Sequence, residues 1–214
     1  MTHRICAVAV VSLIAVAACS GGSDTKAGPT ANASTDPTRT VLAIGSSATE
    51  GDGVPDRLQD AWPYLVYRDA FPISTAFVNG ALDDATAAHA LADQAPLAVE
   101  LKPDLVEVWI GADDLRASTP IPVFTLTFTR LVAALRAAGS RRILIADLPA
   151  AYGSRASSYN AAIHSVVAST HAELVSLANA VITLAPTDGL PPQPDAASHR
   201  AIAAAFARSI ARGQ

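Results

Sequence analysis

Residues 40–214 are predicted to fold as an α/β protein, a three-layer α/β/α sandwich around a parallel sheet. Short apolar runs alternate with segments of helical periodicity from Val41 onward. The runs are apolar at nearly every position, which is typical of strands in a parallel sheet that helices cover on both faces. The region is long enough for one domain of ordinary size.

Five segments are predicted to form the strands of this sheet, of which four are strongly apolar and the last is weaker. They are residues 40–45, 74–79, 105–110, 142–146 and 180–184. Function in such a sheet lies in the loops at the carboxyl ends of the strands. Candidate site residues are therefore expected in the loops that follow the strands and in the segment before the last helix.

Apolar spacings of three and four residues predict helices between the strands. One apolar stripe consists of Leu58, Trp62, Leu65 and Val66. A second consists of Phe124, Phe128, Leu131, Val132 and Leu135. The second helix is expected to close at Gly139, a typical C-terminal cap. The last helix is predicted over residues 195–212.

The first eighteen residues carry one cation, Arg4, followed by an almost unbroken apolar run over residues 5–18. As a helix this run would extend about 21 Å, short of the ~30 Å hydrocarbon core of a membrane. A secretory signal is therefore favoured over a membrane-spanning anchor. The small residues before Cys19 resemble a bacterial lipoprotein signal, in which that cysteine becomes lipidated. An ordinary signal peptide with an incidental Cys19 is the alternative.

Residues 19–39 are rich in Ser, Gly, Thr and Pro, and they are predicted to be a flexible tether because they have little apolar surface to bury. Processing at Cys19 would remove Cys6 with the leader, so no disulfide is expected in the exported domain. We expect an outward-facing lipoprotein on the cell membrane, held by its lipid anchor. The domain itself, residues 40–214, is expected to be a monomer.

The charge balance argues against a nucleic-acid partner. The chain has 15 Lys and Arg against 19 Asp and Glu, a formal net charge of −4, whereas binding to phosphates needs clustered cations. No Cys/His cluster has the spacing of metal ligands, and no glycine-rich phosphate loop follows the first strand. Paired Asp residues at strand ends more often cap helices than bind metals. We therefore expect no metal and no cofactor.

The turn after the first strand, residues 45–51, reads Gly-Ser-Ser-Ala-Thr-Glu-Gly. Ser47 would present its hydroxyl at a helix N-terminus, where free N–H groups and the helix dipole favour developing negative charge. This position suits a nucleophile, but serines also cap helices in such turns. On this motif alone both interpretations of Ser47 stay open.

Three later segments, taken in order with this turn, carry a resemblance to a known family. They are residues 79–86, which read Asn-Gly-Ala-Leu-Asp-Asp-Ala-Thr, residues 111–114, which read Gly-Ala-Asp-Asp, and the stretch containing Asp188 and His199. The ordered set resembles the SGNH (GDSL-like) hydrolases over residues 40–212. The resemblance implies a flavodoxin-like strand order. It also implies hydrolysis of a small-molecule ester, a lipid or an acylated carbohydrate by a serine, a late Asp and His, and an oxyanion hole.

Carried over position by position, the resemblance makes Ser47 the nucleophile and Asp188 the acid that orients the base. The second block of the family usually offers a glycine N–H to the oxyanion. Asp84 stands at that position, and Gly80 would serve if the loop were shifted. Asp113 replaces the asparagine of the third block, and an ionised carboxylate cannot donate the hydrogen bond that the amide supplies.

The base position is the largest departure from the family. Counting forward from Asp188 puts Pro191 there, and counting back from His199 puts Gln193 there; neither accepts a proton near neutral pH. His199 is either a substitute base, partnered by Asp188 or Asp195, or a structural histidine of the last helix, which is the preferred interpretation. On the resemblance as a whole, the chain is predicted to be an ester or acyl hydrolase acting through Ser47. The alternative is a non-catalytic relative with a binding or cell-envelope role.

Overall fold

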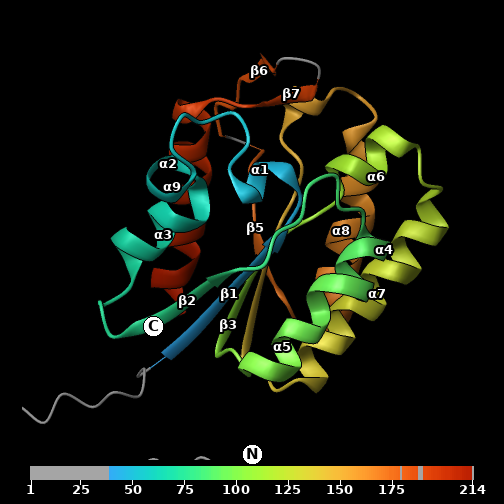
Figure 1. Ribbon diagram of the computed structural model, residues 1–214. Coiled ribbons are helices and arrows are strands. Elements are labelled where there is room, and N and C mark those ends of the chain that lie inside the picture. The colour runs from blue at the N-terminus through green and yellow to red at the C-terminus, as the bar shows by residue number, and fades with distance from the viewer. Residues whose placement is uncertain (1–38, 179, 188–189, 214) are drawn as a thin grey trace, which may run out of the picture. The chain divides into compact units, whose positions relative to one another are not determined.

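The computed structural model describes residues 39–178, 180–187 and 190–213. Its main sheet has five strands that pair in parallel in the order β2-β1-β3-β4-β5 (Figure 1). The strands are β1 (Arg39–Gly45), β2 (Thr75–Asn79), β3 (Leu105–Trp109), β4 (Arg142–Ala146) and β5 (Glu173–Val175). The predicted α/β class and the five-stranded parallel sheet are confirmed.

Helices cover the sheet on both faces (Figure 1). On one face lie α3 (Trp62–Ala70) and α9 (Ala196–Arg212), and on the other lie α5 (Ala95–Leu101), α7 (Ile121–Ala137) and α8 (Ala156–Thr170). In the first layer the ring of Trp62 stacks on Phe206 with centroids 4.3 Å apart. In the second, Phe124 stacks on Phe128 at 5.3 Å. Each face of the sheet therefore has its own apolar core.

Short elements complete the fold. They are the helices α1 (Ser47–Glu50), α2 (Arg57–Asp60), α4 (Ala87–His89) and α6 (Ala112–Ala117), the π-helix η1 (Ala90–Gln94), the 3-10 helix η2 (Ala150–Tyr152), and the antiparallel strands β6 (Leu184–Thr187) and β7 (Leu190–Pro194). The ribbon shows α1, α6 and the β6–β7 hairpin at the end of the sheet where the parallel strands finish (Figure 1). This is the end at which the sequence places the candidate site.

Two predicted elements differ from the structure. The fifth strand is Glu173–Val175, not residues 180–184, and Leu184 begins the separate β6–β7 hairpin. This edge strand escapes a search for apolar runs because it is only three residues long and begins with a Glu that binds Arg142. The first apolar stripe also breaks: Ala61 is extended between α2 and α3, and Leu58 is 68% exposed.

The predicted leader, Cys19 and the tether up to residue 38 lie outside the described residues, as does Asp188. Within the part of the chain that the structure describes, no helix is both long enough and apolar enough to cross a membrane.

Candidate active site

Ser47 is the first residue of α1, and only Ser46 separates it from the end of β1. The side-chain amide of Gln94 holds this strand end, because it accepts from the Gly45 N–H at 2.9 Å and donates to the Gly45 carbonyl at 2.8 Å. A Cβ at Gly45 would lie 2.0 Å from Thr49 Oγ1, so only glycine allows the turn to close this tightly. The Ser47 hydroxyl is thereby held at the carboxyl end of the sheet.

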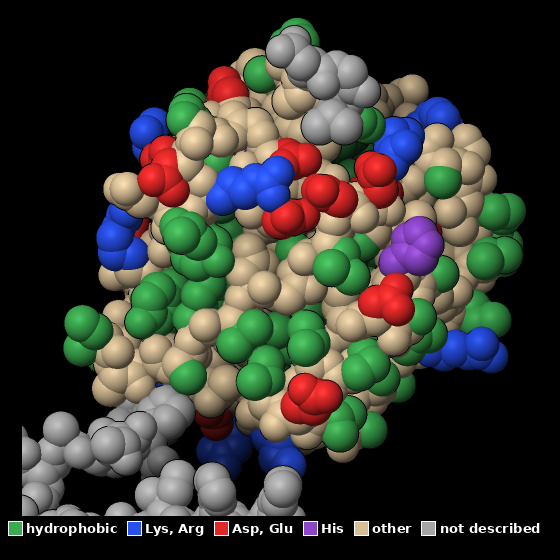
Figure 2. Space-filling view, viewed as in Figure 1, with side chains coloured by type: hydrophobic (Ala, Val, Ile, Leu, Met, Phe, Trp, Pro, Cys, Tyr) green, Lys and Arg blue, Asp and Glu red, His purple; other side chains and the backbone are tan. Residues whose placement is uncertain are grey.

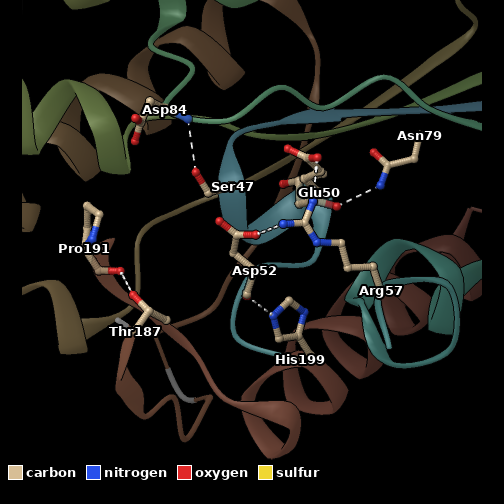
Figure 3. A network of polar contacts seen from close by, with 10 residues as sticks. Ser47, Glu50, Asp52, Arg57, Asn79, Asp84, Thr187, Pro191 and His199 are labelled. Atoms are coloured by element: carbon tan, nitrogen blue, oxygen red, sulfur yellow. Dashed lines mark hydrogen bonds and ion pairs between the residues drawn. The ribbon is translucent and has the colours of Figure 1, made fainter. Parts of the chain in front are cut away.

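Asp84 supplies the backbone donor next to this hydroxyl. Its N–H donates to Ser47 Oγ at 3.0 Å, and Figure 3 shows the Ser47 side chain pointing toward it. Asp84 has φ of +53°, in the left-handed region that favours glycine. Gly80, the other candidate donor, uses its N–H on the carbonyl of Ala43 at 2.9 Å. Of the two positions, the structure brings Asp84 to Ser47.

Arg116 lies between the two carboxylates that stand at oxyanion positions of the family. Its Nη2 is 2.8 Å from Asp84 Oδ1 and 2.8 Å from Asp113 Oδ1. The hydrogen bond with Asp113, followed by the charges of both carboxylates, raises the pKa of Arg116. The guanidinium therefore offsets negative charge that would oppose an oxyanion. Arg116 is not among the site residues predicted above, although its spacing of three from Asp113 on one helix is a signal for such a pair.

A second acidic group lies beside α1. Arg57 pairs with Glu50 at 2.6 Å and with Asp52. Burial raises the pKa of Glu50 and of Asp52, and the nearby carboxylate of Asp83 raises both further. Acidic and basic side chains lie close together on the face of the molecule that Figure 2 shows. Among the described residues, no group of three or more His, Cys, Asp and Glu side chains is arranged to hold a metal ion.

His199 is fully buried, and both of its ring nitrogens contact backbone groups. Nδ1 accepts from the Trp62 N–H at 3.0 Å, and Nε2 lies 3.2 Å from the carbonyl oxygen of Asp52 (Figure 3). Since Nδ1 accepts, the proton of the neutral ring is on Nε2, where it is donated to Asp52. Burial lowers the pKa of His199, which also favours the neutral ring. No lone pair of this ring is left for the Ser47 proton.

Asp195, one of the two partners considered for His199, is the N-cap of α9. Its side chain accepts from the Ser198 N–H at 2.8 Å, and this contact lowers its pKa. The other described histidines belong to other parts of the fold: His89 to the cap of α4, His164 to α8 beside Asp147 at 3.2 Å, and His171 to the C-terminal cap of α8. Within the described residues, no histidine is hydrogen-bonded to Ser47.

Gln193 lies on β7, is 7% exposed, and shares a cavity of about 150 Å³ with the residue next to the nucleophile. The cavity is lined by Ser46, Ala112, Asp113, Leu115, Arg116, Tyr152, Leu184, Pro191, Pro192 and Gln193. Both residues that the sequence aligns with the family's base, Pro191 and Gln193, thus face the same small space. The β6–β7 hairpin brings them there, an element that the sequence did not predict.

Comparisons with known proteins bear on the family and the fold of the chain. A model of the GDSL-like lipase/acylhydrolase family matches residues 43–212. No curated protein matches the chain by sequence.

Solved structures that are similar to the chain share less than a quarter of its sequence and show the fold. The structure of TesA has 22% identity and a TM-score of 0.68, with 80% of this chain and 97% of that chain covered. The psychrotrophic esterase EstA from Pseudoalteromonas sp. has 20% identity and a TM-score of 0.67, with 82% and 98% covered. A catalytic mutant of Axe2, an acetylxylan esterase from Geobacillus stearothermophilus, has 18% identity and a TM-score of 0.64, with 81% and 94% covered. The family model matches residues 43–212, which include most of the sheet and the serine at the end of its first strand. The chain therefore belongs to the GDSL-like lipase/acylhydrolase family.

Proposed function

We propose that the chain is an exported, membrane-tethered lipoprotein that hydrolyses an ester or acyl bond through Ser47. The observation that carries this proposal is the hydrogen bond from the Asp84 N–H to Ser47 Oγ. It places a nucleophile and a backbone donor together at the end of the sheet, as acyl transfer requires.

In the proposed reaction Ser47 Oγ attacks the carbonyl carbon and forms a tetrahedral intermediate. The oxyanion accepts hydrogen bonds from the N–H groups of Asp84 and Ser47, while Arg116 offsets the charge of the nearby carboxylates. The intermediate expels an alkoxide, which takes a proton from water and leaves as the alcohol. A second water molecule then hydrolyses the acyl-serine, which releases the acid and restores the Ser47 hydroxyl. The Ser47 proton passes to water, because no histidine among the described residues accepts it. Turnover is therefore expected to be about four to six orders of magnitude below that of a complete triad.

The substrate class follows from the size and lining of the cavity. A space of about 150 Å³ with Leu115, Leu184 and Pro192 in its wall suits a short acyl group better than a long chain. EstA is an esterase and Axe2 an acetylxylan esterase, which supports a small ester or an acetylated carbohydrate here. Arg116, which lines the cavity, offers a donor to the hydroxyl groups of a sugar.

A second candidate function is favoured by the hydrogen bonds of His199. With Nδ1 and Nε2 both bound to backbone groups, the chain would keep the family fold as a non-catalytic binding protein of the cell envelope. Its cavity would then hold an acylated ligand without cleaving it.

The substitution Ser47→Ala distinguishes these functions. In the proposed hydrolase it lowers the turnover of p-nitrophenyl acetate by about tenfold or more, because the acyl-enzyme path is lost, and it abolishes labelling by a fluorophosphonate probe. Ser165→Ala is the matched control, since it makes the same change at an exposed position on α8. Equal turnover and equal labelling of the wild type and Ser47→Ala would favour the binding protein.

The tether is tested separately by Cys19→Ser. In cells that process lipoproteins, the wild type is expected in the membrane fraction with incorporated radioactive palmitate. The Cys19→Ser chain is expected to lack the label, because a serine cannot form the thioether that carries the lipid. Cys6→Ser is the control. Equal palmitate labelling of the wild type and Cys19→Ser would exclude lipidation at this cysteine.

A further inference from the structure

A second, larger cavity lies at the opposite end of the sheet from Ser47. Its volume is about 560 Å³, and its wall includes the first residues of β1, β2, β3 and β4. The lining residues are Arg39, Pro72, Thr75, Asp104, Leu105, Arg141, Arg142 and Gly213. In Figure 1 this is the end at which the parallel strands begin. The proposed hydrolysis makes no use of this cavity.

Three arginines meet in this cavity, and only one of them is neutralised by a described carboxylate. Arg142 forms a two-point ion pair with Glu173, at 2.8 and 2.7 Å. Arg39 and Arg141 form no ion pair with any carboxylate in the described ranges. The guanidinium of Arg39 lies 6.0 Å from the ring centroid of Phe71, which leaves its N–H groups available.

Two further polar residues lie in the wall of the cavity. The carboxylate of Asp104 accepts from the Thr40 N–H at 2.9 Å, which holds this one anion against the backbone. Thr75 is 4% exposed, and its hydroxyl has no hydrogen-bond partner among the described residues. A buried hydroxyl without a partner is costly, but this oxygen is closed off from solvent and is not counted among the groups that a ligand in the cavity would contact. Among the described residues, the wall therefore offers two guanidinium groups without an ion pair against a single carboxylate.

We propose that this cavity binds a phosphate group, either as free phosphate or as the phosphate of an ester or lipid headgroup. Arginine side chains bind phosphate oxygens through paired, charge-assisted hydrogen bonds, and the volume exceeds what a lone phosphate needs, so that an attached group also fits. The predicted tether ends at Arg39 in the wall, which makes a membrane headgroup one of the two sources. This inference does not rest on the proposed function of Ser47.

Calorimetric titration of inorganic phosphate into the full-length chain, in non-ionic detergent at low salt, tests the proposal. The double substitution Arg39→Gln/Arg141→Gln is expected to weaken binding about tenfold or more, because both charge-assisted donors are lost. Asp104→Asn is expected to tighten it by about threefold, because the like charge is removed. The matched control is Arg130→Gln/Arg200→Gln, which removes the same charge from exposed positions on α7 and α9 and leaves binding unchanged.

Two results would overturn the proposal: no binding of phosphate by the wild type, or equal weakening by the two double substitutions. The opposite effect of Asp104→Asn guards against a loss caused only by misfolding. Vesicles of phosphatidylcholine with and without phosphatidylglycerol distinguish the sources. Preference for the anionic vesicles that disappears in Arg39→Gln/Arg141→Gln supports a lipid headgroup. Phosphate binding with no such preference supports a soluble phosphate compound.

Discussion

Replacing Gln193 with histidine is expected to raise kcat/KM for p-nitrophenyl acetate by about 10²- to 10⁴-fold, the usual contribution of a positioned general base. Gln193 is buried on β7 and lines the same cavity as Ser46, the residue beside the nucleophile. An imidazole at this position would enter that cavity with a nitrogen able to accept the Ser47 proton. The amide of glutamine has no such basic atom.

The pH profile identifies the cause of the gain. A histidine base must be neutral, so kcat/KM of the Gln193→His chain should rise with pH through a value near 6.5, the ordinary pKa of histidine. The wild type should lack this limb. Gln193→Asn keeps an amide and serves as the control. A gain that persists in Gln193→His/Ser47→Ala would contradict the role of Ser47.

The same experiment distinguishes the two possible alignments of the base. Pro191 also lines the cavity, and its carbonyl accepts from Thr187 Oγ1 at 2.7 Å (Figure 3). If Pro191→His, and not Gln193→His, gives the gain, the base position is three residues after Asp188. Our expectation for Gln193 would then be wrong.

Glu107→Gln is expected to stabilise the folded chain by about 3 kcal/mol at pH 7. Glu107 is fully buried in the middle of β3, paired in register with Ala43 and Leu144. Neither of its carboxyl oxygens has a hydrogen-bond partner among the described residues. Burial raises the pKa of Glu107 from 4.5 to about 8, so the folded chain holds this group neutral at pH 7.

The sign of the pH dependence follows from that shift. The folded state binds the proton more tightly than the unfolded state, so stability is full below pH 4.5 and is lost as the pH rises from 4.5 to about 8. Urea unfolding of the wild type should therefore show a falling free energy between pH 5 and pH 8. The curve of Glu107→Gln should be flatter, because a glutamine has no proton to lose.

Glu100→Gln is the matched control, because it makes the same chemical change at an exposed position on α5. It should leave the pH dependence of the wild type unaltered. If Glu107→Gln and the wild type lose stability in parallel between pH 5 and pH 8, the carboxyl of Glu107 is not the group that titrates.

The layers of the fold could be predicted from the sequence because periodicity reports burial directly. The runs around Leu42 and Leu144 are apolar throughout, the run around Val106 is apolar apart from Glu107, and the structure buries Leu42, Val106 and Leu144 completely. The edge strand at Glu173–Val175 could not be found this way, because an edge strand is short and partly solvated. The hairpin that carries Gln193 is rich in proline, which disfavours a strand prediction.

The position of Ser47 at the carboxyl end of the sheet was predictable, since its turn follows an apolar run that reads as a strand. The choice between Gly80 and Asp84 was not, because it depends on which backbone N–H points toward the hydroxyl. The contacts of His199 with Trp62 and Asp52 join residues more than 130 positions apart. Such contacts arise from the packing of distant segments, so they cannot be predicted from the spacing of residues along the chain.

The hydrogen bonds between Gln94 and Gly45 also affect how motion can spread through the protein. A carboxamide donates and accepts from one planar unit, as a peptide group does, so Gln94 presents the end of β1 with the same two contacts that a neighbouring strand would offer. The residue belongs to the π-helix η1, in the layer that packs on the opposite face from α9. A displacement of η1 would therefore pull on the end of β1 and shift Ser47, which follows it. The position of the nucleophile is thus mechanically linked to a helix that contributes no residue to the cavity beside it.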